Sequence, residues 1–142
     1  RGLTYSVSAY PLPMANAGLI LGSVSTKNSK VKETVLLLKK VWKEFSVKGP
    51  RKEEVENAKS YLKGSYGLQF TNSRSIAGLL VALQRHKLGV DYLTERSKLI
   101  EDVTLSDLKR VAKQLFNDDK LMFAIIGTPE NMKSSISIPA LD

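Results

Sequence analysis

Two segments near the start of the chain alternate apolar and polar residues with a period of two. The first is rich in β-branched and aromatic residues and predicts a half-buried strand over about residues 2–10. Pro11 and Pro13 are expected to end this strand, because proline has no N–H to donate to a strand ladder. The second segment predicts a strand over about residues 17–25, and the short connection between the two indicates a hairpin.

A block of helices and a third strand follow the hairpin. Apolar residues recur at helical spacing, with Asn28 or Ser29 as the expected first N-cap and Pro50 as the first residue of the second helix. The expected helices span about residues 29–47, 50–66, 73–88, 92–101 and 105–116. A continuous apolar run then predicts a strand over about residues 120–127 that is covered on both faces.

Local signals mark two of the later helix starts. The third helix is expected to open near Asn72 or Ser73, where the helical spacing of apolar residues begins. Thr104 and Asp107 have the three-residue spacing of a capping box, with Asp in place of the usual Glu. These signals place both helix starts to within a residue.

The order of elements predicts an α+β fold, with an antiparallel or mixed β-sheet and a block of helices packed on one face. We expect a single domain across residues 1–142, in keeping with its length, with 42% hydrophobic and 25% charged residues and a real buried core. Three strands are few for so many helices. We therefore expect further strands upstream of residue 1.

The residue types exclude several kinds of site. The chain has no cysteine and one histidine, His86, so it has no disulfide, thiolate metal cage or cysteine nucleophile. Zinc sites need three or four ligands drawn mainly from His and Cys, so we expect no metal or other cofactor in this chain. His86 falls near a predicted helix C-terminus, where a half-buried structural role is expected. A self-contained hydrolytic centre is not expected.

No signal-peptide pattern and no membrane-length apolar run occurs in the sequence, which predicts a soluble chain and leaves its compartment open. The net charge is +8, and most of the excess comes from lysines and arginines between Lys27 and Lys52. One interpretation is a solvated helical face. The alternative is a basic module that binds nucleic acid or an acidic protein, which would lose affinity for an oligonucleotide steeply as salt rises. We favour the first and expect no nucleic-acid partner.

Two aromatic residues are candidates for function. Trp42 is in register with Leu38 and Phe45, so a core role is expected. Tyr5 lies near the start of the first strand, where its phenol can donate a hydrogen bond to a developing oxyanion. The pattern around Tyr5 also fits a core residue, because it alternates with other apolar residues. The residues alone leave both roles open.

Several segments, in the same order along the chain, resemble motifs of one protein family. Residues 1–7 read R-G-L-T-Y-S-V, and residues 18–25 are similar to the strand that follows this motif in the family. Residues 89–93 and 103–112 resemble its G-x-D-Y-L and V-T-x-x-D-[VL]-x-R-V-A patterns, and residues 123–127 resemble its terminal strand. Together these segments resemble the M16 zinc metallopeptidases related to insulin-degrading enzyme, pitrilysin and mitochondrial processing peptidase.

The resemblance implies an enzyme of two related halves that close around an extended peptide, with this chain as the C-terminal portion of the second, non-zinc half. Zinc in that family is bound by a His-x-x-Glu-His helix and a downstream Glu in the first half, and none of these is present here. The implied function is substrate binding within a zinc metalloendopeptidase that cleaves peptides or unfolded polypeptides. The alternative is a noncatalytic partner subunit.

The resemblance also assigns roles and partners. Tyr5 matches the tyrosine that grips the substrate carbonyl, whereas the family's arginine stands three residues before the position of Arg1 and so falls upstream. The implied partners are a peptide substrate and the N-terminal zinc-bearing half or a partner subunit. Unpaired strand edges at residues 3–10 or 121–126 would also favour self-association of the isolated chain. Alone, the chain is expected to hydrolyse nothing.

Overall fold

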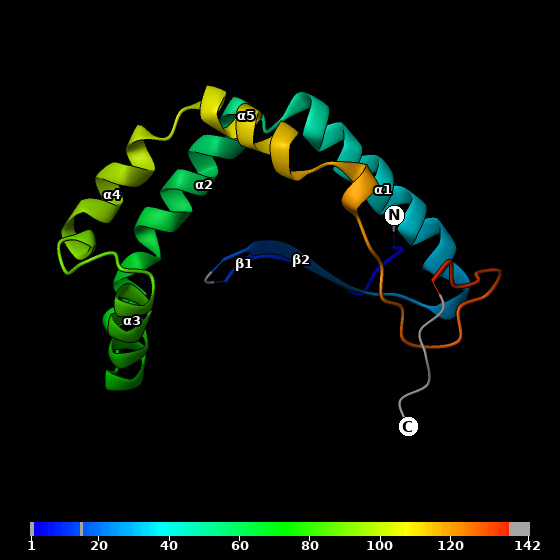
Figure 1. Ribbon diagram of the computed structural model, residues 1–142, viewed down its shortest axis with the longest axis horizontal. Coiled ribbons are helices and arrows are strands. Elements are labelled where there is room, and N and C mark those ends of the chain that lie inside the picture. The colour runs from blue at the N-terminus through cyan, green and yellow to red at the C-terminus, as the bar shows by residue number, and fades with distance from the viewer. Residues whose placement is uncertain (1, 15, 137–142) are drawn as a thin grey trace. The chain divides into compact units, whose positions relative to one another are not determined.

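The computed structural model describes residues 2–14 and 16–136 and confirms the α+β class (Figure 1). Its elements are β1 (Ser6–Pro13), β2 (Gly18–Ser25), α1 (Val31–Lys48), α2 (Lys52–Gly64), α3 (Ser73–Arg85), α4 (Tyr92–Asp102) and α5 (Leu105–Leu115). Short 3-10 helices span Asn28–Lys30, Tyr66–Phe70 and Asp118–Lys120. The chain divides into two compact units, which are treated separately below: one contains residues up to Lys43 and from Asp118 onward, and the other is residues 44–117.

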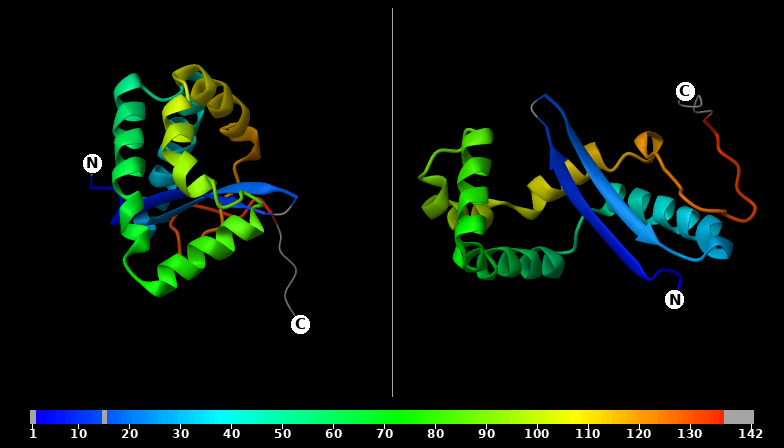
Figure 2. Two further views of the ribbon diagram at one scale, coloured as in Figure 1. Left: turned by 90° about the vertical axis from the view of Figure 1, so that its left-hand side faces the viewer. Right: turned by 90° about the horizontal axis from the view of Figure 1, so that it is seen from below.

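The first unit contains an antiparallel hairpin, whose two strands lie side by side in both views of Figure 2. Its register runs from Ser6 opposite Ser25 to Pro13 opposite Gly18. The prediction that Pro11 and Pro13 end the first strand was therefore wrong. Residues two apart direct their main-chain N–H groups to the same side of a strand, and an edge strand tolerates proline where that side faces away from its partner.

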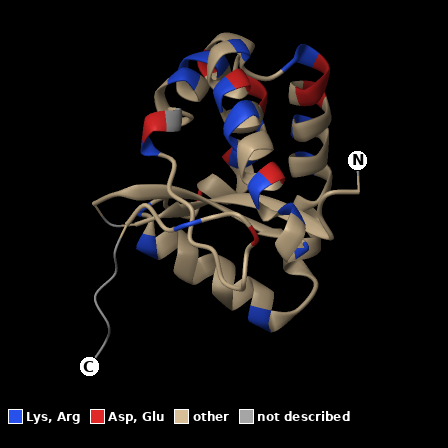
Figure 3. Cartoon of the chain, turned by 90° about the vertical axis from the view of Figure 1, so that its right-hand side faces the viewer, with Lys and Arg blue, Asp and Glu red and all other residues tan. Residues whose placement is uncertain are grey.

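The hairpin exposes both of its faces. Side chains opposite each other share a face, so Val7 with Val24 and Pro11 with Ile20 lie on one side, while Tyr10 with Leu21 lies on the other. Val7 is 67% exposed and Tyr10 is 51% exposed. Neither strand contains a charged residue (Figure 3). The predicted half-burial is therefore not reached, because nothing in the described part of this unit covers either face.

The predicted third strand is absent from the described residues. Residues 121–126 form no strand and make no main-chain hydrogen bond there, so the prediction was wrong. Met122 is 81% exposed and Ile126 is fully exposed, so the expected cover on both faces is missing as well. A strand exists only with a partner in the ladder, and the described chain supplies none for this apolar run.

The start of α1 is tied to the segment after that run. Asn28 was expected to be an N-cap, but a 3-10 turn precedes α1 and the Asn28 side chain donates instead to Thr128 Oγ1 at 2.8 Å. The main-chain N–H of Glu130 also donates to the Asn28 carbonyl oxygen, at 3.3 Å. Lys39 of α1 lies over the Phe123 ring, 5.9 Å from its centroid. These contacts position residues 123–130 beside the beginning of α1.

The helices of the second unit begin close to where their local signals place them. The Asn72 side chain accepts from the Ser75 N–H at 2.9 Å, and Thr104 and Asp107 form the expected capping box at the start of α5. One boundary differs: α2 begins at Lys52 with Arg51 as its N-cap, whereas Pro50 was predicted as its first residue. The Arg51 main-chain N–H donates to Glu54 Oε2 at 2.8 Å, and this bond fixes the start of α2 two residues later than predicted.

Aromatic and ionic contacts hold the second unit together. The Phe45 and Phe116 rings meet edge to face with centroids 4.7 Å apart. α2 packs against α4, where Lys63 Nζ lies 2.7 Å from Glu101 Oε1. The Arg96 guanidinium stacks 4.3 Å from the Tyr66 ring centroid. These contacts join helices that are short and largely exposed.

The buried core is much smaller than predicted. Buried hydrophobic side chains among the described residues are Val31, Val55, Leu83 and Ala112, together with the polar Thr34. Trp42, expected as a core anchor, is half-buried. Apolar residues on the helices are well exposed, Val47 to 78% and Val81 to 62%. The expectation of a real core was wrong for the described residues, because no further layer covers these apolar faces.

Candidate functional site

Tyr5 lies immediately before β1 and is held there by its main chain. Its N–H donates to the Ser25 carbonyl oxygen at 2.8 Å, and the Thr26 hydroxyl donates to the carbonyl oxygen of Leu3 at 2.5 Å. The Tyr5 side chain is 73% exposed. Of the two roles left open by the sequence, the core role therefore does not fit the described structure. The phenol is available to a ligand while its backbone is fixed.

A cavity opens beside Tyr5, and it brings together residues more than twenty positions apart in the sequence. Its lining comes from the segment before β1 and from the segment after β2: Gly2, Leu3, Thr4, Tyr5, Lys27 and Lys30. Lys30 Nζ pairs with Glu33 Oε2 at 3.0 Å. The lining residues include one tyrosine and two lysines but no Asp or Glu. This chemistry suits a carbonyl oxygen or an anion.

The sequence pattern places Lys27 and Lys30 only in a basic run and does not indicate that they lie beside Tyr5. The missed signal was the hairpin itself. An antiparallel hairpin returns the chain to its starting end, so the residues after its second strand meet those before its first. The rest of the basic run is dispersed over α1 and the start of α2, where Arg51 forms an ion pair with Glu54.

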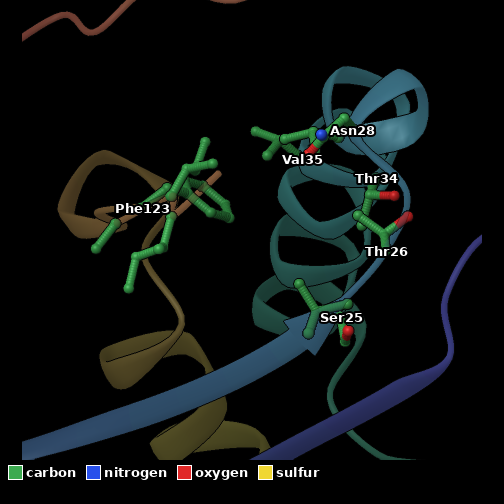
Figure 4. A pocket seen from close by; sticks show the side chains of 11 residues that line it. Ser25, Thr26, Asn28, Thr34, Val35 and Phe123 are labelled. Atoms are coloured by element: carbon green, nitrogen blue, oxygen red, sulfur yellow. The ribbon is translucent and has the colours of Figure 1, made fainter. Parts of the chain in front are cut away.

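A second cavity in the same unit is lined by both apolar and polar residues. It lies between residues 24–26 at the end of β2, the first turns of α1 and residues 123–126. In Figure 4, Phe123 lies across this cavity from Val35 of α1. The buried Thr34 hydroxyl in its wall has no hydrogen-bond partner among the described residues. The lining includes no titratable side chain, so the cavity can accommodate apolar side chains but cannot transfer protons.

The carboxylates whose pKa is shifted belong to helix starts and ion pairs of the second unit. Hydrogen bonds from the Arg51 side chain and main chain lower the pKa of Glu54. A hydrogen bond from Lys63 lowers the pKa of Glu101, and one from the Thr104 hydroxyl lowers the pKa of Asp107. All three side chains are exposed and none lines either cavity. They indicate structural contacts, not acid–base chemistry.

The described residues contain no group of three or more His, Asp or Glu side chains placed to hold a metal ion. His86 is the C-cap of α3, as its position near a helix end predicted, but it is exposed and not half-buried. Among the described helices none is long and apolar enough to cross a membrane.

Comparisons with known proteins agree with the resemblance seen in the sequence. Residues 1–62 match the family model described as the peptidase M16 inactive domain. A crystal structure of a peptidase M16 inactive domain from Pseudomonas fluorescens matches 84% of this chain with a TM-score of 0.73 and 28% sequence identity. The resemblance to the second, non-zinc half of the M16 peptidases is confirmed.

The chain is much shorter than the M16 protein that it matches. It spans 28% of the length of the Pseudomonas fluorescens chain that it matches. No curated protein sequence matches it. Both matches are to M16 inactive domains, and this sequence contains no His-x-x-Glu-His motif.

Proposed function

We propose that this chain is the substrate-binding C-terminal region of a zinc-dependent M16 metalloendopeptidase that cleaves peptides or unfolded polypeptides. Its share of the mechanism is to hold the peptide while the chemistry takes place on the other half. The zinc ion, with the His-x-x-Glu-His helix and the general base, belongs to that other half. A noncatalytic partner subunit of an M16 peptidase is the alternative.

The observation that carries the proposal is the exposed and anchored phenol of Tyr5. A hydrogen-bond donor aids hydrolysis when it is fixed where negative charge develops on the carbonyl oxygen, because it then needs no reorganisation during the reaction. The bond from the Tyr5 N–H to the Ser25 carbonyl oxygen fixes the backbone, and the open cavity leaves the hydroxyl accessible. Tyr5 is therefore the residue we assign to the substrate carbonyl.

The uncovered apolar surface supports pairing with another domain. A two-stranded hairpin has marginal stability by itself, and exposed apolar patches of this kind mark interaction sites. The hairpin is uncharged on both faces, and residues 121–126 have unpaired main-chain groups within the described structure. We assign these surfaces to contacts with the zinc-bearing half or a partner subunit.

The purified chain alone is expected to show no peptidase activity that a chelator removes, because it has no zinc ligands to supply. The full-length protein that contains it is expected to cleave unfolded polypeptides and to stop when zinc is chelated. The peptidase activities of the chain alone and of the full-length protein are measured with the same fluorogenic peptides. Chelator-sensitive cleavage by the chain alone contradicts the proposal, and an inert full-length protein that activates a zinc-bearing subunit establishes the alternative.

In isolation the chain is expected to self-associate, since a second copy is then the only cover for its unpaired segments and apolar hairpin. Light scattering over a range of concentrations measures this, with the full-length protein as the control. A chain that stays monomeric at high concentration contradicts the assignment of these surfaces as interfaces.

A further inference from the structure

The cavity beside Tyr5 contains a lysine placed there by two specific bonds. Thr26 donates to the Leu3 carbonyl oxygen, and the Tyr5 N–H donates to the Ser25 carbonyl oxygen, so the two segments are joined on either side. Lys27 follows Thr26 directly, and its position in the cavity wall results from this joining. Lys27 and the Tyr5 phenol therefore open into one space.

The positive charge in this cavity is only partly balanced. Lys30 is balanced by Glu33, 3.0 Å away. Lys27 has no ion pair among the described residues, and the neighbouring strands β1 and β2 contain no charged residue. Lys27 thus lines the space next to Tyr5 without a counter-ion from the described chain. A ligand with a carboxylate would supply that counter-ion.

We infer that Lys27 selects peptides with a carboxylate near the residue whose carbonyl Tyr5 binds. This inference rests on the proposed function and adds a substrate class to it. The carboxylate comes from an acidic side chain or from the peptide C-terminus, because both present the same two oxygens to an ammonium group. An exposed ion pair of this kind is expected to strengthen binding about two- to fivefold at low salt. Salt screens such a pair, so the preference shrinks as ionic strength rises.

The test measures peptide binding to the full-length protein with zinc removed, so that no peptide is cleaved and an inactive parent can still be examined. The probes are short labelled peptides in which one Glu is moved along an otherwise uncharged sequence, each compared with its Gln counterpart. Each pair is made with a free and with an amidated C-terminus, which separates the two sources of the carboxylate. Fluorescence anisotropy gives the dissociation constants.

We expect a carboxylate at one position to bind about two- to fivefold more tightly than its neutral counterpart, and Lys27→Met to abolish this difference. Lys27→Glu should reverse it, so that peptides with Lys at that position are favoured. Lys32→Met is the matched control: Lys32 is exposed near the start of α1, five residues along the chain from Lys27, and does not line the cavity, so the preference should persist. A Glu-to-Gln ratio that is the same in Lys27→Met as in the parent overturns the inference.

Failure of this inference can be told apart from failure of the proposed function. Peptides that bind without any carboxylate preference overturn the role of Lys27 and leave substrate binding standing. A protein that binds none of the peptides overturns both. A preference that is lost equally in Lys32→Met indicates general charge attraction and also overturns the specific role of Lys27.

Discussion

Replacement of Tyr5 by Phe in the full-length zinc enzyme is expected to lower kcat by about 10- to 1,000-fold. The substitution removes only the phenol oxygen, so it deletes the proposed donor to the substrate carbonyl and keeps the ring. A donor that acts where charge develops lowers the barrier more than it strengthens ground-state binding, so KM should change much less than kcat. The loss corresponds to about 1.4–4 kcal/mol of transition-state stabilisation.

The stability of the Phe variant separates this role from a structural one. Tyr5 is 73% exposed, so the unfolding temperature is expected to stay nearly unchanged. Tyr10→Phe is the matched control, since Tyr10 is also exposed on the hairpin but does not line the Tyr5 cavity. Steady-state kinetics and thermal unfolding of both variants make the comparison. Full activity of the Tyr5 variant, or equal losses in both, would refute the assignment.

Replacement of Gly49 by Ala is expected to destabilise the second unit by about 2 kcal/mol. Gly49 follows the last residue of α1 with φ of +65°, and its N–H donates to the Phe45 carbonyl oxygen at 2.8 Å. A side chain in this left-handed conformation costs roughly 1–2 kcal/mol. An added Cβ would also lie 2.7 Å from Lys109 Cγ and 3.3 Å from Lys109 Cα, so α5 would have to shift.

Thermal unfolding followed by circular dichroism measures this effect, which should lower the midpoint by about 4–8 °C. Gly64→Ala is the matched control, because Gly64 ends α2, has no positive φ and has open space around its Cβ position. There the smaller unfolded-state entropy of Ala is expected to leave stability unchanged or to raise it by up to about 1 kcal/mol. Equal midpoints for the two variants would contradict the argument from φ and Lys109.

The sequence by itself determined the helices and most of their ends. The hydrogen bonds of a helix join residues four apart, and a cap acts within three residues, so the information is local. The start of α3 near Asn72 or Ser73 and the Thr104–Asp107 box were predicted from a few neighbouring residues and are present. The start of α2 was predicted two positions too early, at Pro50 instead of Lys52, because Glu54 accepts the Arg51 N–H, a bond the proline rule does not consider.

Only the tertiary structure decided which apolar segments are paired or covered. Residues 121–126 have the composition of a buried strand, yet a strand needs a partner distant in sequence, and none is described for them. Pro11 lies inside β1, which continues to Pro13, because the side of the strand that faces β2, not the residue type, decides whether a missing N–H matters. The same dependence on distant residues explains Tyr5, which alternation left undecided between core and site. Its exposure, and the presence of Lys27 beside it, follow from the hairpin bonds that join residues 3–5 to residues 25–26.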